Sequence, residues 1–323
     1  MQKQILIAGG GIGGLAAALG ASRAGWEVRL FERAPQFSEV GAGVQIGPNV
    51  VRRLQAWGLQ GALQAVAAFP DRLQVRSALS GAELATLRLG ATAIERYGAA
   101  YATIHRADLH GLLLGAVQAG GAVHLNLGES IEGHTDQGGV VTLQLPGGRM
   151  VEGDALVGAD GLRSGTRARL LGEAPPRVSG HLAYRAVVRQ DALPQGLRTG
   201  HVTAWLGPRL HVVQYPLRRG ELMNIVAIRH GEAPADLDGW DHAANAADLD
   251  AALAGTCTAL RDLVDLPPAA RQNLGRRARE RIVDEFSLPV YANRHLELYE
   301  RALDAHRRHG AARASPLHHG ETA

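Results

Sequence analysis

The hydrophobic and polar positions at the start of the chain alternate between short apolar runs and a helical stretch. Residues 4–8 (QILIA) form a continuous apolar run, which is typical of a central parallel strand buried on both faces. A glycine-rich segment follows, then an alanine-rich helix over residues 15–24, and then a second strand over residues 28–31 that ends at Glu32. A strand, a helix and a strand within about 30 residues predict a βαβ unit.

The pattern beyond this unit predicts more strands than helices. Four β segments between residues 184 and 228 favour an antiparallel sheet, and helical patterns return from residue 243. The elements expected before this sheet are a loop over residues 35–48, a helix over 49–57, a hairpin over 73–89, a strand over 101–104, a helix over 108–119, and strands over 123–127, 140–145 and 150–157.

Composition and charge narrow the class of protein. Cys257 is the only cysteine among 323 residues, which excludes an intrachain disulfide and a cysteine-only metal site. No apolar run reaches the roughly 20 residues of a membrane span, and the start of the chain lacks the layout of a signal peptide, so we expect a cytoplasmic protein. The net charge of +3 comes from scattered arginines, and aromatic residues make up only 4%, so we expect no nucleic acid partner.

The segment GGGIGG, directly after the first strand, satisfies the pattern G-x-G-x-x-G. Gly9 permits a tight turn, Gly11 lets the backbone approach a pyrophosphate, and Gly14 lets the helix pack close to the strand. Glu32 stands at the end of the next strand, where it can accept hydrogen bonds from a ribose diol. Arg33 follows it and can pair with a ribose 2′-phosphate, so NADP stays an alternative to FAD and NAD. The sequence thus predicts a dinucleotide-binding loop for FAD, NAD or NADP.

Three further stretches combine with this loop: GAGVQIGPN at residues 41–49, HRADLHGLL from His105, and GADGLRSGTR from Gly158. Together with GGGIGG they resemble the class A FAD-dependent aromatic hydroxylases, most closely the salicylate, hydroxybenzoate and hydroxynicotinate hydroxylases. The resemblance extends over about residues 4–265.

The resemblance implies an α/β fold: a Rossmann-like FAD-binding domain with an inserted or following antiparallel β-sheet domain for the substrate, and a helical C-terminal tail. The domains expected are FAD-binding over residues 1–70 and 98–178, substrate-binding over 71–97 and 179–265, a helical tail over 266–305, and a disordered end over 306–323.

The resemblance also assigns candidate site residues. Arg106 reaches the cofactor from the start of its helix, and Asp160 and Gly161 lie close to FAD and to the incoming NAD(P)H. The ADP half of FAD is held by Gly9, Gly11, Gly14 and Glu32, with Arg33 beside them.

The implied substrate contacts are His211 and Tyr215. Their spacing in a predicted strand puts both on one face of the sheet, where ordinary packing is the alternative reading. In the family, a histidine and a tyrosine at matching positions lie against the substrate. The histidine can take a phenolic proton, and the tyrosine hydroxyl can stabilise the phenolate. Arg185 is a candidate for a substrate carboxylate.

The implied reaction needs no metal. NAD(P)H passes hydride to the flavin, the reduced flavin takes up O2 to form a C4a-hydroperoxyflavin, and this species hydroxylates a phenolic or aromatic acid. The implied partners are therefore a small aromatic substrate and O2, and the expected assembly is a monomer or homodimer.

One expected family element is not found in the sequence. The family carries a second FAD segment with a Gly-Asp motif, and nothing after residue 230 matches it. From Gly275 the chain instead resembles the C-terminal helices of GT-B glycosyltransferases. Two alternatives to an active monooxygenase therefore stay open. One is a catalytically impaired, truncated or chimeric FAD-binding remnant; the other is an NAD-dependent dehydrogenase, which leaves Arg106 and Asp160 without a role.

Overall fold

The computed structural model describes residues 3–37, 42–172, 177, 179–231 and 246–264. The chain divides into two compact units, Met1–Asp265 and Leu266–Ala323, and every described residue belongs to the first. The predicted helical tail, the predicted disordered end and the glycosyltransferase-like stretch therefore lie outside the described residues. In the described part of the chain, no helix combines the length and hydrophobicity that a membrane span requires.

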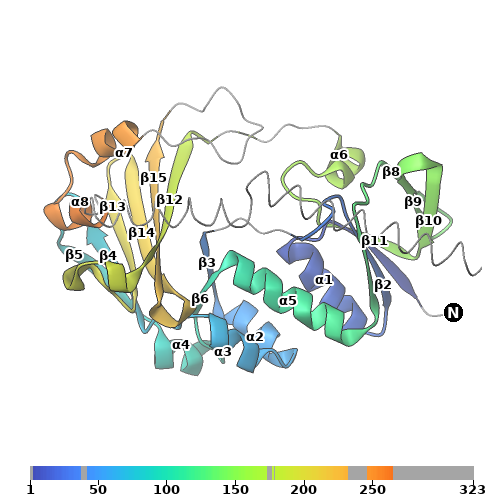
Figure 1. Cartoon of the computed structure of the whole chain (residues 1–323), viewed down its shortest axis with the longest axis horizontal. Helices are drawn as coiled ribbons and strands as arrows, with labels where there is room; N and C mark the ends of the chain where they lie inside the picture. The colour runs from blue at the N-terminus through green and yellow to red at the C-terminus, as the bar shows by residue number, and fades with distance from the viewer. Residues whose placement is uncertain (1–2, 38–41, 173–176, 178, 232–245, 265–323) are drawn as a thin grey trace, which may run out of the picture. The chain divides into compact units, whose positions relative to one another are not determined.

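A parallel sheet with the strand order β11–β1–β2–β7 carries the predicted βαβ unit (Figure 1). Helices α1 (Ile12–Arg23) and α5 (Arg106–Gly120) pack against each other and along one face of this sheet. Strand β1, helix α1 and strand β2 follow one another as the sequence predicts. The strands span Gln4–Ala8 (β1), Glu27–Glu32 (β2), Val123–Leu127 (β7) and Ala155–Gly158 (β11).

Strand β1 is buried on both faces, as its continuous apolar run predicts. Ile7 packs into the core beneath α1 and α5, whereas Leu6 points the other way and packs with Phe31. That second core is closed by a three-stranded antiparallel sheet, β8–β9–β10. The sheet spans Gly133–Gln137 (β8), Val140–Leu145 (β9) and Arg149–Gly153 (β10).

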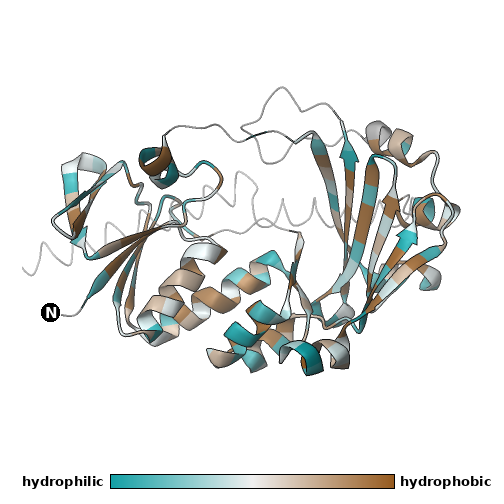
Figure 2. Ribbon diagram, turned by 180° about the vertical axis from the view of Figure 1, so that it is seen from behind, coloured by the Kyte–Doolittle hydropathy of each residue, from teal (hydrophilic) through white to brown (hydrophobic). Residues whose placement is uncertain are grey.

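A six-stranded sheet with the order β12–β15–β14–β13–β4–β5 makes up the rest of the described β structure apart from one short pair. Brown and teal alternate along its strands in Figure 2, as expected for a sheet whose two faces differ in polarity. All neighbouring strands are antiparallel except β13 and β4, which run parallel. This one pair differs from the antiparallel sheet that the sequence predicts. The strands span Arg72–Ser77 (β4), Glu83–Arg88 (β5), His181–Arg189 (β12), Val202–Gly207 (β13), Leu210–Leu217 (β14) and Leu222–His230 (β15).

The structure differs from the predicted strands at three further places. Strand β8, which pairs with β9, is not predicted from the sequence. The predicted loop over residues 35–48 contains strand β3 (Gly43–Ile46), which pairs with β6 (Ala102–His105). The predicted strand over residues 150–157 is two strands, β10 and β11, which belong to different sheets. The break falls at Asp154, whose Oδ2 accepts a hydrogen bond from the N–H of Gln4 at 2.7 Å.

The remaining described helices are short. Helices α3, α4 and α6 carry no strong sequence signal and are not predicted. The short helices span Pro48–Ala56 (α2), Gln60–Val66 (α3), Gly90–Tyr97 (α4), Gly165–Leu171 (α6), Ala246–Leu253 (α7) and Thr258–Val264 (α8), and the 3-10 turns span Pro146–Gly148, Gln190–Ala192, Gln195–Leu197 and Arg218–Gly220.

Candidate functional site

The glycine loop, residues 9–14, joins β1 to α1 and contains very close packing. Gly9 has a φ of 101°, in the left-handed region that favours glycine. A Cβ on Gly14 would lie 1.8 Å from the carbonyl oxygen of Gly9, so only glycine lets α1 pack this closely. A Cβ on Gly11, by contrast, would meet no atom within 4 Å. The loop is therefore closed at Gly9 and Gly14 and open at Gly11, where the backbone has room for a ligand.

The start of α1 is suited to an anion. Gly11 is the N-cap residue, no side chain caps the helix, and the first turn contains no acidic residue. The first N–H groups of a helix have no partner within the helix, and the helix dipole adds positive charge there. The open space beside Gly11 and this helix end together fit a pyrophosphate.

Glu32 and His110 hold the main chain of Gly10. Glu32 Oε2 accepts from the N–H of Gly10 at 2.6 Å, and Oε1 accepts from the N–H of Ala34 at 2.9 Å. His110 Nε2 lies 2.9 Å from the carbonyl oxygen of Gly10 and must carry the proton, because a carbonyl oxygen only accepts. An ionised carboxylate offers about four lone-pair sites. Glu32 can therefore still accept hydrogen bonds from a ribose diol.

His110 holds the glycine loop, a role that the sequence analysis does not assign to it although it lies in the stretch HRADLHGLL. Its side chain is only 5% exposed and lies on α5 among buried apolar residues such as Leu109 and Leu113. Its ring also packs 5.4 Å from the ring of Phe37. A histidine on the apolar side of a helix is the signal that could have found it, because buried polar groups are normally hydrogen-bonded. Its partner, 100 residues away, cannot be read from the sequence.

Asp160 stabilises the turn between β11 and α6. Its Oδ1 accepts from Ser164 Oγ at 2.5 Å, and its Oδ2 accepts from the N–H and the hydroxyl of Thr166, both at 3.0 Å. Ser164 Oγ also accepts from the N–H of Arg167 at 2.9 Å and caps α6. Burial raises the pKa of Asp160, but the hydrogen bonds from Ser164 and Thr166 outweigh burial and lower the pKa. The carboxylate is therefore ionised at neutral pH and fixed in the turn.

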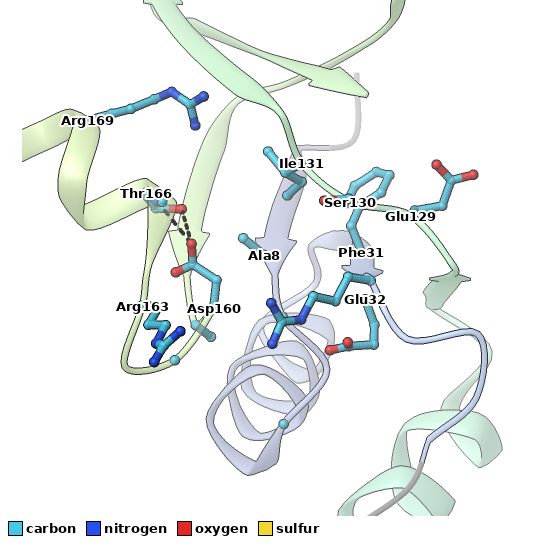
Figure 3. A pocket seen from close by; sticks show the side chains of 16 residues that line it. Ala8, Phe31, Glu32, Glu129, Ser130, Ile131, Asp160, Arg163, Thr166 and Arg169 are labelled. Carbon is cyan, nitrogen blue, oxygen red and sulfur yellow. Dashed lines mark hydrogen bonds between the residues drawn. The ribbon is translucent and has the colours of Figure 1, made fainter. Parts of the chain in front are cut away.

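The glycine loop and the Asp160 turn line one cavity of about 400 Å³. Binding pockets for small molecules measure roughly 300 to 1,000 Å³. Figure 3 shows Phe31 and Glu32 on one side of the cavity, and Asp160, Arg163 and Thr166 on the other. Six of the predicted cofactor residues line it: Gly9, Gly11, Glu32, Arg33, Asp160 and Gly161.

The other two predicted cofactor residues lie outside the lining of this cavity. Gly14 packs beneath the loop against Gly9. Arg106 is the first residue of α5, and its N–H donates to the carbonyl oxygen of Ala42 at 3.2 Å. Arg106 therefore lies beside β3 rather than beside Glu32.

His211 and Tyr215 lie on β14, on the same face of the six-stranded sheet, and neither lines the cavity described above. Four residues of a strand span about 13 Å, so the two side chains start from well-separated points. The hydroxyl of Tyr215 donates to the carbonyl oxygen of Gly43 at 2.7 Å. Burial raises the pKa of Tyr215 to about 12, although Arg185 and Gln45 act in the opposite direction. Tyr215 is therefore a neutral hydrogen-bond donor at physiological pH.

A bidentate ion pair joins the end of β14 to the start of α5. Arg218 Nε and Nη2 donate to Asp108 Oδ2 and Oδ1, each at 2.8 Å. Asp108 lies in the first turn of α5, where the helix dipole favours an acid. Arg218 and Arg219 have φ values of 45° and 57°, which non-glycine residues rarely adopt. The ion pair between Arg218 and Asp108 therefore stabilises an unusual turn.

Comparison with known proteins agrees with this geometry. The family model described as "FAD binding domain" matches residues 2–188. The 3-hydroxybenzoate 6-hydroxylase of Polaromonas naphthalenivorans is 37% identical over 265 residues, which are 81% of this chain and 65% of that relative. The 6-hydroxynicotinate 3-monooxygenase of Bordetella bronchiseptica is 32% identical over 83% of this chain and 69% of its own length.

A solved structure supports the fold. Klebsiella pneumoniae HpxO, solved with FAD and uric acid, matches with a TM-score of 0.70 at 24% identity, over 83% of this chain and 66% of that one. The chain thus spans 65% of the length of the Polaromonas relative and 66% of HpxO. The relatives' names confirm the resemblance to aromatic hydroxylases that the four sequence stretches indicate. Because the family model covers more than half of its length, the chain belongs to the family that carries this FAD-binding domain.

Proposed function

We propose that this chain acts as an FAD-dependent monooxygenase that hydroxylates a phenolic or other aromatic acid with NAD(P)H and O2. The observation that carries the proposal is the convergence of Gly11, Glu32 and Asp160, from three separate sequence segments, on one cavity. The names of the hydroxybenzoate and hydroxynicotinate relatives support the class of substrate.

The described residues fit the ADP half of FAD. The open backbone at Gly11 and the uncapped start of α1 bind the pyrophosphate, and Glu32 accepts from the ribose. Arg106 donates to phosphate or ribityl oxygens from the start of α5, and Arg33 and the Asp160 turn line the cavity. When bound, FAD supplies the hydride-accepting and O2-activating chemistry.

The substrate lies against the face of the six-stranded sheet that carries His211 and Tyr215. His211 accepts the phenolic proton, and the Tyr215 hydroxyl donates to the phenolate oxygen. The raised pKa of Tyr215 keeps this donor protonated. Arg185 is on the same face of the sheet and binds the carboxylate of the substrate.

The purified protein tests the proposal in two steps. We expect flavin absorbance in the visible spectrum, either as purified or after FAD is added and excess FAD removed. We then expect NADH or NADPH oxidation that depends on 3-hydroxybenzoate, 6-hydroxynicotinate or salicylate, with a hydroxylated product by mass spectrometry. A protein that stays colourless with FAD contradicts the proposal. A yellow protein that forms no product with any aromatic acid supports the FAD-binding remnant instead.

Tyr215→Phe tests the substrate contact. Loss of a hydrogen bond to a charged oxygen reduces hydroxylation by about 10- to 100-fold. Tyr184→Phe is the matched control, because Tyr184 lies on the opposite face of the same sheet and its hydroxyl accepts from Arg229. An active preparation in which Tyr215→Phe hydroxylates as fast as Tyr184→Phe removes Tyr215 from the catalytic residues.

A further inference from the structure

Two side chains of the six-stranded sheet make hydrogen bonds to the carbonyl oxygen and the N–H of Gly43, in β3. The Tyr215 hydroxyl donates to its carbonyl oxygen at 2.7 Å, and Asn224 Oδ1 accepts from its N–H at 2.9 Å. Tyr215 and Asn224 are direct neighbours across β14 and β15. A Cβ on Gly43 would lie 2.6 Å from Tyr215 Cε2, so any other residue forces neighbouring side chains to move. Two adjacent side chains of the sheet therefore hydrogen-bond one glycine of β3, a strand far away in the sequence.

The contact made by Asn224 has a cost in folding stability. Its side chain is fully buried, with 0% exposure. The atom that faces the Gly43 N–H must be the amide oxygen, because only oxygen accepts, so the Nδ2 group points elsewhere. Within the described part of the chain, Nδ2 has no hydrogen-bond partner. An unpaired buried donor destabilises a protein, and a leucine of similar size would avoid it. Packing alone does not account for asparagine here.

Gly43 connects the sheet to the start of α5. Gly43 pairs with His105 in the β3–β6 ladder, and the preceding carbonyl, of Ala42, accepts from the N–H of Arg106 at 3.2 Å. Arg106 is the cofactor candidate that lies outside the cavity of the glycine loop. A displacement of Gly43 therefore displaces the backbone that positions Arg106.

We propose that Asn224 is a positioning residue that holds Gly43, and through it the Arg106 backbone, while the substrate is bound. The inference rests on the proposed function, in which Tyr215 donates to the phenolate. The Tyr215 hydroxyl has one proton, so donation to a substrate oxygen leaves the Gly43 carbonyl without that partner. Asn224 is then the side chain that keeps Gly43 in place and keeps Arg106 aligned with FAD.

Two measurements on Asn224→Leu test this role. The first is amide hydrogen exchange of residues 42–47 in the protein without cofactor. The second is FAD affinity from flavin fluorescence, with and without 3-hydroxybenzoate. Loss of one hydrogen bond speeds exchange at Gly43 by about threefold to tenfold and weakens FAD binding by a similar factor. The weakening is greater with 3-hydroxybenzoate present, because Tyr215 is then engaged elsewhere.

Two control variants separate positioning from a general loosening of β15. Asn224→Asp keeps an acceptor for the Gly43 N–H and restores slow exchange. Ile225→Val removes a methyl group from the next residue, which is buried on the opposite face, and leaves exchange at Gly43 and FAD affinity within about twofold of wild type. If Asn224→Leu does not fold, Asn224→Ser, whose hydroxyl is too short to reach Gly43, takes its place.

Three results overturn the inference: unchanged exchange in Asn224→Leu, equal acceleration in Ile225→Val, or faster exchange with unchanged FAD affinity. A wild-type protein that binds no FAD overturns the proposed function and the link to Arg106 with it. The exchange rates need no cofactor and still decide whether Asn224 holds Gly43.

Discussion

Two glycines in this protein are held in the same way by different parts of the fold. The N–H of Gly10 donates to Glu32 and its carbonyl accepts from His110, whereas the corresponding groups of Gly43 contact Asn224 and Tyr215. Glu32 is 22 residues from Gly10 and belongs to the same βαβ unit, but Asn224 is 181 residues from Gly43.

The two glycine contacts differ in the atoms that surround them. In the glycine loop, a Cβ on Gly9 or Gly14 would collide with main-chain atoms, whereas the atoms nearest a Cβ on Gly10 belong to the side chains of Phe37 and Glu32. Around Gly43 the neighbours are the side chains of Tyr215 and Leu217, which can adjust. We therefore expect the glycine loop to be rigid and the Gly43 contact to be adjustable.

The largest effect is expected from Gly14→Ala. Its Cβ would lie 1.8 Å from the Gly9 carbonyl, so α1 must move away from β1 and unfolding free energy falls by about 3 kcal/mol or more. FAD binding is lost with the loop geometry. Denaturant unfolding and a flavin titration measure both. Gly13→Ala is the control, because its Cβ meets nothing within 4 Å and alanine favours a helix. Equal stability of the two variants contradicts the rigid loop.

A smaller loss is expected from Gly43→Ala. The added Cβ would lie 2.6 Å from Tyr215 Cε2 and 2.9 Å from Leu217 Cδ2, and these side chains can partly move. Overpacking of this kind costs about 1 to 3 kcal/mol. Gly61→Ala, in helix α3 with no atom within 4 Å, is the matched control and is neutral or stabilising. A loss as large as that of Gly14→Ala removes the distinction between the two glycines.

His110→Leu tests the hydrogen bond to Gly10 directly. The Gly10 carbonyl loses its donor. FAD affinity then falls by about threefold to tenfold, which corresponds to the net free energy of one hydrogen bond. His110→Gln places an amide N–H near the position of Nε2 and recovers most of the affinity. Isothermal titration with FAD measures both variants. Equal affinities of the Leu and Gln variants show that the hydrogen bond from His110 does not position the loop.

The smallest effect is expected from the acid titration of Asp160. Its pKa is lowered in the folded protein, so its ionised form stabilises the fold fully above 3.8, the ordinary pKa of an aspartate. This contribution is lost as the pH falls below that value towards the pKa of the folded state. The difference in melting temperature between wild type and Asp160→Asn is therefore full at pH 6 and shrinks as the pH falls below 3.8. A difference that stays constant over this range means that the Asp160 charge does not stabilise the turn.

Local sequence predicted the parts of the site that depend on local geometry. The strand before Gly9, the helix after it and the acid at Glu32 follow from apolar periodicity and from the demands of a tight turn. The Asp160 turn carries its own signal, because Ser164 and Thr166 are close enough in sequence to bond the carboxylate. The role of each of these residues in FAD binding stays a prediction that the spectra and titrations decide.

Contacts between distant segments carried no such signal. His110 lies in the stretch HRADLHGLL and Asn224 in a predicted strand, but neither position reveals its partner, because each contacts a glycine at least 100 residues away. The break at Asp154 has the same origin, since its partner Gln4 is 150 residues distant.

The βαβ unit and its dinucleotide-binding loop can be predicted from local sequence, because strand and helix periods and glycine requirements act over a few residues. Three features arise only when distant segments pack together: β13 runs parallel to β4, residues 150–157 divide between two sheets, and Tyr215 donates to Gly43. Those outcomes depend on how whole sheets pack against one another. The free energy of that packing comes from many residues, so no single stretch of the chain predicts it.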